Sequence, residues 1–316
     1  MACTIEWNTL STAGWQERAG RIRRFPLLQD LAYARAMRAS RQLSARWGLI
    51  RIDGAEAGLA QMLEARLFGE AIHLLTLDRG PVWFEGYGGL DHWRAFAAAF
   101  AERFPRRIGR RRRFLPELED TPAARDLLVA AGFHRQAGVP GYQTLWLDLT
   151  PGLDALRAGL KQKWRNTLNR AERHDLAVQN DEGRGILPWV LARYAADRKA
   201  RGYPGPAPGF LRALGGAFAP EGRLLILTAA KDRPVVAAVV LVLHGTAATY
   251  QIGWSSEQGR RLGAPSLLLW RAVEGLKARG IRDFDLGGVN DRDAAGVKAF
   301  KAGLGGREVR LVGQYG

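Results

Sequence analysis

The chain has 316 residues, 47% of them hydrophobic and 25% charged, and its 47 Lys and Arg against 31 Asp and Glu give a net charge of +16. This is the composition of a globular protein, and the length suffices for two ordinary domains. The single cysteine, Cys3, excludes an intramolecular disulfide, and the five histidines lack metal-binding spacing, so we expect no metal site and no Cys–His nucleophile pair.

The positive charge favours a polyanionic partner, such as RNA, an anionic membrane surface or a phosphate-rich substrate. A GC-rich genome, which encodes many arginines, would also produce it. Residues 1–8 lack the basic and apolar regions of a signal peptide, and the longest apolar run, 235–243, is far shorter than a membrane span of ~20 residues. We therefore expect a cytoplasmic protein without a transmembrane segment, for which peripheral contact with a membrane stays open.

The first half of the sequence predicts a mixed α/β domain. Asp53-Gly54 is a hairpin turn signal between two strand-like segments, and Thr121-Pro122 is an N-cap and first-turn pair for a helix. In chain order the predicted elements are helix 27–46, strands 47–53, 58–64 and 71–77, helix 90–104, strand 110–115, helix 121–131 and strand 142–149. The helix at 90–104 places four aromatic residues on one face: Trp93, Phe96, Phe100 and Phe104.

The second half repeats this alternation of helices and strands. Its predicted elements are helix 151–174, helix 189–201, a helix from Phe210, strands 224–230, 235–244 and 246–254, helix 265–278 and strand 283–286. Two similar α/β units predict a duplication at the level of fold, without a repeat at the level of residues. We place the domain boundary at Thr150-Pro151-Gly152, giving domains 1–150 and 151–304, and expect residues 305–316 to form a strand that returns to the first domain.

The helix predicted at 151–174 is strongly basic. Arg157, Lys161, Arg165 and Arg173 fall on one stripe, with Glu172 as the one acid between them. Like charges on one helix face cost stability unless a partner neutralises them. The stripe is therefore interpreted in two ways that stay open, as a binding surface for an anionic partner or as a solvated helix face.

The densest basic cluster lies at 106–113. If this segment is a strand, alternate arginines point to opposite faces, so they cannot all serve one ligand. We interpret the cluster as an exposed arginine run that protects the edge of a sheet. A diffuse contribution to RNA affinity stays open, and salt dependence would reveal it.

A glycine-bounded segment at 296–306 presents Phe300 and Lys301 side by side, after the short strand 284–289. Most lysines are exposed on the surface. Here we expect Lys301 to be partly buried, because apolar and glycine residues flank it. A buried cation beside closely approaching main chain is a means of holding a developing oxyanion.

Three stretches of this sequence resemble the Fem family of aminoacyl-tRNA-dependent transferases, which add amino acids to peptidoglycan precursors. They are 74–82, 160–172 with the pattern K-x-R-x-x-L-x-x-A, and 250–306 with the Phe300-Lys301 pair. The resemblance implies an α/β fold of two tandem GNAT-like domains, each a mixed sheet flanked by helices. It also implies transfer of an amino acid from aminoacyl-tRNA, the co-substrate, to an amine of a peptide-bearing acceptor, with no cofactor.

The resemblance implies roles for particular residues. Lys301 and the main chain of Phe300 would stabilise charge at the attacked ester. We place the acceptor beside four residues: Arg198, Arg201, Tyr250 and Asp285. The two arginines are candidates for contacts with the phosphates of the acceptor. We assign contacts with tRNA to three residues: Lys161, Lys163 and Arg165. Asp285 has a second interpretation, as a structural cap.

Two other functions stay open. The first is an acyl-CoA-dependent N-acyltransferase on the same fold, whose phosphate-binding loop would correspond to 260–265; there Pro265 removes an amide that pyrophosphate would need. The second is a non-catalytic RNA-binding protein, which would not need the segment 296–306. The sequence also departs from the Fem pattern, because it has no long helical arm, and because Arg35 and Arg38 do not match the lysine-plus-aromatic pattern of the N-terminal acceptor site. The acceptor is therefore left open, and natural-product peptides remain candidates.

Overall fold

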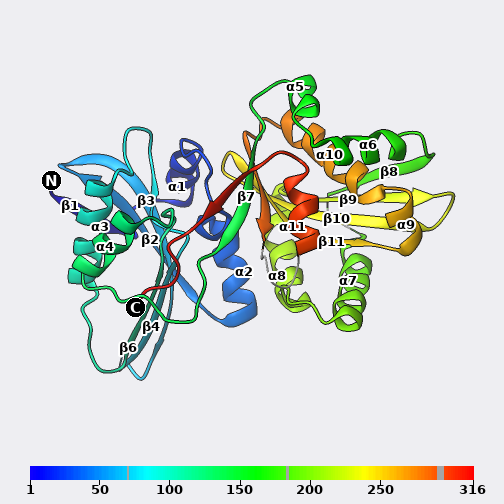
Figure 1. Ribbon diagram of the computed structural model, residues 1–316. Coiled ribbons are helices and arrows are strands. Elements are labelled where there is room, and N and C mark those ends of the chain that lie inside the picture. Colours follow the sequence, from blue (N-terminus) through cyan, green and yellow to red (C-terminus); the bar gives the residue numbers. More distant parts are fainter. Residues whose placement is uncertain (70, 183–184, 290–294) are drawn as a thin grey trace. The chain divides into compact units, whose positions relative to one another are not determined.

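The computed structural model describes residues 1–69, 71–182, 185–289 and 295–316, which form two α/β units (Figure 1). The first unit comprises Met1–Gln143 and Val309–Gly316, and the second comprises Thr144–Glu308. Each contains one mixed sheet with flanking helices, which confirms the predicted fold class. The units divide at the start of strand β7 (Gln143–Asp148), ahead of the predicted boundary at 150–152, because β7 pairs with β12 (Asp283–Gly288) in the second sheet.

The sheet of the first unit has the strand order β1-β2-β3-β4-β6, and β5 also pairs with β3. The bounds are β1 Cys3–Trp7, β2 Ser44–Ile52, β3 Ala55–Leu67, β4 Ile72–Asp78, β5 Val82–Trp83 and β6 Arg110–Leu115. The hairpin between β2 and β3 turns at Asp53 and Gly54, which both have positive φ, as the sequence predicts for a two-residue turn.

Helices on the first sheet bury an aromatic core. They are α1 Thr12–Ala19, the 3₁₀ turn Leu27–Gln29, α2 Leu31–Arg41, α3 Leu90–Arg103 and α4 Pro122–Ala130. The four aromatic residues predicted on one face of α3 and at its end are buried. The predicted helix 27–46 is wrong at its C-terminal end, because Gln42 adopts the left-handed conformation and the chain enters β2 at Ser44.

Strand β6 lies at the edge of the first sheet and carries the arginine run. The arginines alternate as predicted, with Arg111 and Arg113 exposed and Arg112 buried. The guanidinium of Arg112 lies 4.7 Å from the ring centroid of Phe133. One arginine of the run therefore belongs to the core and others to the surface of the edge strand.

The sheet of the second unit has the order β13-β7-β12-β11-β10-β9-β8. Its remaining strands are β8 Leu176–Asp181, β9 Leu224–Lys231, β10 Val235–His244, β11 Ala247–Ser255 and β13 Arg307–Arg310. Strands β11 and β12 run parallel, and their register covers only Ala247–Thr249 against Asp283–Asp285. Beyond that point β12 departs from regular pairing, and the site described below lies there.

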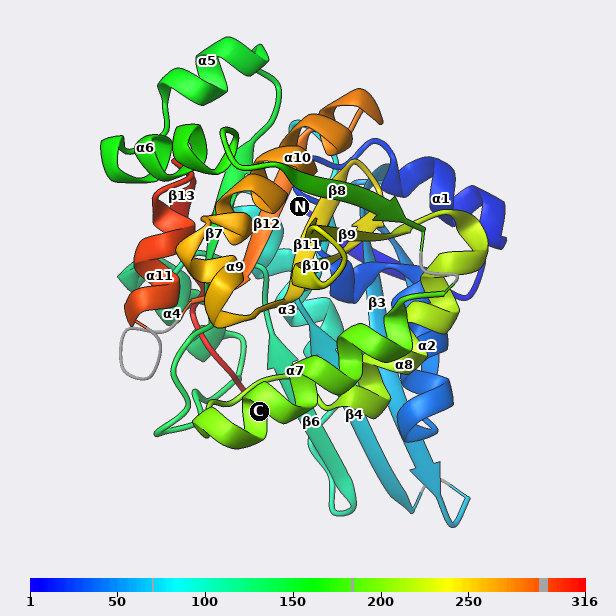
Figure 2. The same ribbon diagram turned by 90° about the vertical axis from the view of Figure 1, so that its right-hand side faces the viewer.

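Helices cover both faces of the second sheet. Their bounds are α5 Leu153–Ala158, α6 Gln162–Ala171, α7 Leu187–Arg201, α8 Pro208–Phe218, α9 Glu257–Arg261, α10 Ala264–Ala278 and α11 Ala295–Ala302, with a 3₁₀ turn at Ala219–Glu221. Helices α6 and α10 lie on one face, and α7 and α8 lie on the other (Figures 1 and 2). Among the described residues, no helix is both long and apolar enough to cross a membrane.

The single helix predicted at 151–174 is wrong. The structure has two helices, α5 and α6, separated by an extended Lys161 whose amide donates to the carbonyl of Gly303 at 3.0 Å. The break folds α5 back, so that Arg157 pairs with Glu172 at 2.9 Å. The predicted basic stripe is therefore interrupted, and Arg157 is neutralised within the protein.

Candidate functional site

A bend in strand β12 forms one wall of the site. The carboxylate of Asp285 accepts from the amide of Gly287 at 2.8 Å and contacts the hydroxyl of Thr144, which also lies 3.0 Å from the carbonyl of Gly287. Gly287 has φ of +74°, and a Cβ there would approach the carbonyl oxygen of Tyr250 to 2.7 Å. The hydrogen bond to Asp285 thus stabilises the positive-φ conformation of Gly287, which glycine adopts without strain. This agrees with the interpretation of Asp285 as a structural cap.

Helix α11 brings Lys301 to this bend. The side chain is buried, at 7% exposed, and its ammonium donates to the carbonyl of Gly288 at 3.0 Å. Burial lowers the pKa of Lys301 to about 8, and the nearby carboxylate of Asp285 partly opposes that shift. At neutral pH the site therefore contains a desolvated cation with two further N–H groups.

Tyr250 lies beside Lys301. The ammonium lies 5.2 Å from the ring centroid of Tyr250, which suits a cation–π contact. Burial raises the pKa of Tyr250 well above its usual value, so the phenol stays protonated. Tyr203, in the loop after α7, donates to Asp197 at 3.2 Å, and burial raises the pKa of Tyr203 to about 12.

Phe300 lies on a different face of α11 from Lys301. Its ring centroid is 6.2 Å from that of Trp164, and a Cβ at Gly303 would come within 2.5 Å of the same indole. Trp164 is buried in the main core of the second unit. Because Phe300 lies inside an eight-residue helix, its amide points along the helix axis toward the preceding turn. This geometry favours a role for Phe300 in seating α11 on α6.

The two predicted acceptor arginines lie in the last turn of α7. Arg201 is exposed and pairs with Asp197 at 2.9 Å, and Asp197 in turn accepts from Tyr203. Arg198 is half-buried, and its side chain lies close to Gly205 in the following loop.

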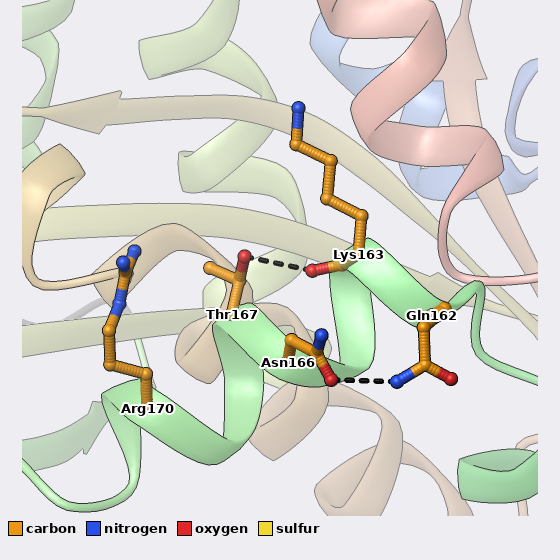
Figure 3. A pocket seen from close by; sticks show the side chains of 5 residues that line it. All are labelled: Gln162, Lys163, Asn166, Thr167 and Arg170. Carbon is orange, nitrogen blue, oxygen red and sulfur yellow. Dashed lines mark hydrogen bonds between the residues drawn. The ribbon is translucent and has the colours of Figure 1, made fainter.

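The three predicted tRNA-binding residues lie at the start of α6. Lys163 is exposed and lines a pocket of about 560 Å³ together with four neighbours on the same helix (Figure 3): Gln162, Asn166, Thr167 and Arg170. Figure 3 shows Arg170 at one end of the set and Gln162 at the other, with Lys163 extending away from the helix between them. Arg165 bonds Gln162 at 3.0 Å and does not line the pocket, and Lys161 is exposed at the helix start. The structure thus adds Arg170 to Lys163 as a second cation of one surface.

The turn between α9 and α10 is closed on itself. The amides of Leu262, Gly263, Ser266 and Leu267 all donate to main-chain carbonyls of residues 258–263, and Pro265 has no amide. Helix α6 packs on this turn, since a Cβ at Gly263 would lie 3.1 Å from Thr167 and 3.2 Å from Ala171. The arrangement leaves the N-terminus of α10 poorly suited to bind pyrophosphate, for which free amides are needed.

The structure brings together three of the predicted site residues, Lys301, Asp285 and Tyr250. Sequence reasoning assigned no site role to three neighbours of this group and of α11: Thr144, Trp164 and Tyr203. Thr144 lies 141 positions from the Asp285 that it contacts, so no local pattern marks it. Tyr203 follows the charged end of α7, and that position beside a Gly/Pro loop was the one available signal.

Comparison with known proteins supports an acyltransferase fold. Residues 154–302, which lie within the second unit, match the family described as an acetyltransferase (GNAT) domain. A comparison with curated protein sequences found no match.

Several solved structures share the fold of the whole chain. FemX superposes with a TM-score of 0.81 at 15% identity, covering 98% of this chain and 96% of its own. The C-terminal domain of a putative lysylphosphatidylglycerol synthetase from Agrobacterium fabrum has a TM-score of 0.54 at 18% identity, covering 96% and 91%. A tandem GNAT protein from the clavulanic acid biosynthesis pathway has a TM-score of 0.50 at 16% identity, covering 99% and 98%. The predicted tandem GNAT-like architecture is confirmed.

Proposed function

We propose that this chain, a Fem-like protein of the GNAT fold, transfers an amino acid from aminoacyl-tRNA to an amine of a peptide-bearing acceptor. A peptidoglycan precursor or a related peptide is the acceptor class that the Fem resemblance favours. The observation that carries the proposal is the buried ammonium of Lys301 at the bend of β12. An aminoacyl-tRNA donor implies a cytoplasmic reaction.

The proposed chemistry needs no covalent intermediate on the protein. The acceptor amine attacks the ester carbonyl carbon, a C–N bond forms, and the ester C–O bond breaks, so that the ribose hydroxyl of the tRNA leaves with a proton. Lys301 would donate to the oxyanion of the tetrahedral intermediate, where a desolvated cation is most effective. Among the residues that the structure describes, no base is evident at this place, and we assign the amine proton to the substrate or to water.

The closed turn between α9 and α10 supports tRNA over acyl-CoA as the donor. A direct test is to measure binding of aminoacyl-tRNA and of acetyl-CoA by titration against the same protein. We expect salt-dependent binding of the tRNA and no measurable binding of acetyl-CoA. Saturable binding of acetyl-CoA with no binding of tRNA would overturn the choice of donor.

The α6 pocket is proposed to contact the tRNA backbone. Exchanging Lys163 and Arg170 for alanine is expected to weaken tRNA binding and to lower the slope of log affinity against log salt by about 1 for each phosphate that the protein no longer neutralises. The matched control is Arg212→Ala, which removes an exposed arginine from α8 of the same unit. An unchanged slope in the double variant would place the tRNA elsewhere.

The rate is expected to depend on the protonation of Lys301. If the cation stabilises the oxyanion, kcat should fall above pH ~8, the pKa that burial produces, and this fall should be absent from the residual activity of Lys301→Arg. A rate that rises through the same pH range would instead assign Lys301 as a base.

Folding lowers the pKa of Lys301 from 10.5, so the folded protein binds fewer protons than the unfolded chain between pH 8 and 10.5. The free energy of unfolding should therefore rise with pH across that window.

A further inference from the structure

An exposed apolar patch lies at one end of the first unit, where the β3–β4 hairpin turns and where the loop before β6 runs beside it (Figures 1 and 2). Phe68 is 83% exposed and Ile108 is 99% exposed, more than any other large apolar side chain among the described residues. We call this surface the hairpin patch; its members are Leu67, Phe68, Ile72, Leu74 and Ile108. Single exposed apolar residues are common, but a cluster of this kind marks an interaction site.

The register of the strands places the patch on one face of the sheet. Leu67 and Ile72 are directly opposite each other on β3 and β4, so their side chains point the same way. Leu74 lies two residues further along β4 and shares this face. Its partner on β6 is Arg111, which is also exposed. The apolar face thus borders the exposed guanidinium of Arg111.

Hydrogen bonds fix the loop of Ile108 against the hairpin. The amide of His73 donates to the carbonyl of Gly109 at 2.8 Å, and Arg107 reaches the carbonyl of Ala71 at 3.5 Å. A Cβ at Gly109 would come within 1.9 Å of the Ala71 carbonyl oxygen, so this close approach requires glycine. Ile108 is therefore held outward in a defined position next to the hairpin.

Arginines border the hairpin patch on its β6 side. Residues 105–113 contain six arginines and no acid. Arg106, Arg107 and Arg111 are exposed, and Arg106 also donates to the terminal oxygen of Gly316 at 2.7 Å. Protruding apolar side chains bordered by cations are the pattern by which proteins bind the interface of an anionic bilayer.

We propose that the hairpin patch docks the protein on an anionic lipid membrane, with Phe68 and Ile108 inserted at the boundary of headgroups and acyl chains and with the arginines on lipid phosphates. Phe68 could stack on a base, but the other four members of the patch are aliphatic and offer nucleic acid neither stacking nor hydrogen bonds, so the patch as a whole favours lipid over RNA. The charge favours an anionic over a neutral surface. This inference goes beyond the proposed transfer reaction and does not depend on it.

The test is flotation of the purified full chain with vesicles of phosphatidylcholine alone or mixed with phosphatidylglycerol. We expect binding to the anionic vesicles only. Phe68→Ser with Ile108→Ser should lower the partition coefficient roughly tenfold or more, as expected when apolar side chains are removed from the interface. Arg111→Gln should lower it about fivefold. The matched control, Val129→Ser, changes an exposed apolar residue of α4 and should bind like the parent.

A second measurement reports insertion directly. In a Cys3→Ser background, a polarity-sensitive fluorophore on Ile108→Cys should shift to shorter wavelength on anionic vesicles, whereas the same label on Val129→Cys should not shift. Absence of vesicle binding, or binding that the serine variants leave unchanged, would overturn the proposal. Loss of RNA binding in those variants without any change in vesicle binding would assign the surface to RNA and would equally overturn it.

Discussion

Replacing Lys301 by alanine is expected to lower kcat for aminoacyl transfer roughly 10²- to 10³-fold, the usual effect of removing one group that stabilises an oxyanion. The ammonium is buried at the bend of β12 and donates to the carbonyl of Gly288 at 3.0 Å, and no further hydrogen-bond partner for its other two N–H groups occurs among the described residues. Because the side chain is only 7% exposed, solvent screens its charge weakly. Steady-state kinetics with saturating aminoacyl-tRNA would measure the effect.

The matched control for this experiment is Lys277→Ala. Lys277 also donates to a main-chain carbonyl, that of Leu149 at 2.8 Å, but it lies in α10 and not at the bend of β12. Its removal should leave kcat close to that of the parent. If Lys301→Ala retained kcat within about threefold while remaining folded, far less than the loss expected for an oxyanion-stabilising group, the role assigned to Lys301 would be wrong.

Replacing Trp164 by alanine is expected to destabilise the second unit by about 3–5 kcal/mol, as for other large aromatic residues deleted from a core. The same change should abolish transfer, because Trp164 is the surface on which α11 rests through Phe300 and Gly303. Without it, the helix that carries Lys301 loses its support. Denaturant unfolding and the transfer rate would together measure both effects.

The variant Trp164→Phe tests whether Trp164 acts through packing alone. The indole nitrogen of Trp164 is buried and has no hydrogen-bond partner among the described residues, so phenylalanine removes volume but breaks no hydrogen bond. We expect a smaller loss of stability than for alanine, with transfer retained. A phenylalanine variant as defective as the alanine variant would show that the indole has a role other than supporting α11.

The predictions that succeeded depended on local patterns. The turn at Asp53-Gly54, the aromatic face of α3 and the alternation along β6 each follow from neighbouring residues, whose periodicity is visible in the sequence. The tandem architecture followed from the repeated order of such elements.

The failures share a different cause, which is contact between residues far apart in the chain. The break between α5 and α6 occurs where Lys161 bonds Gly303, and nothing between 151 and 174 specifies that bond. The same holds for Thr144 on Asp285. The interpretation of a basic stripe failed for this reason, since the break turned Arg157 toward Glu172, while Arg170 joined Lys163 at the α6 pocket.

The most direct test of the proposed function is a transfer assay with purified protein, radiolabelled aminoacyl-tRNAs and an extract rich in envelope precursors, with Lys301→Ala and Lys277→Ala run in parallel. We expect label in a ribonuclease-resistant product for the parent and for Lys277→Ala, and its loss in Lys301→Ala. No transfer from any aminoacyl-tRNA, together with acyl transfer from an acyl-CoA to the same extract, would contradict the proposed function.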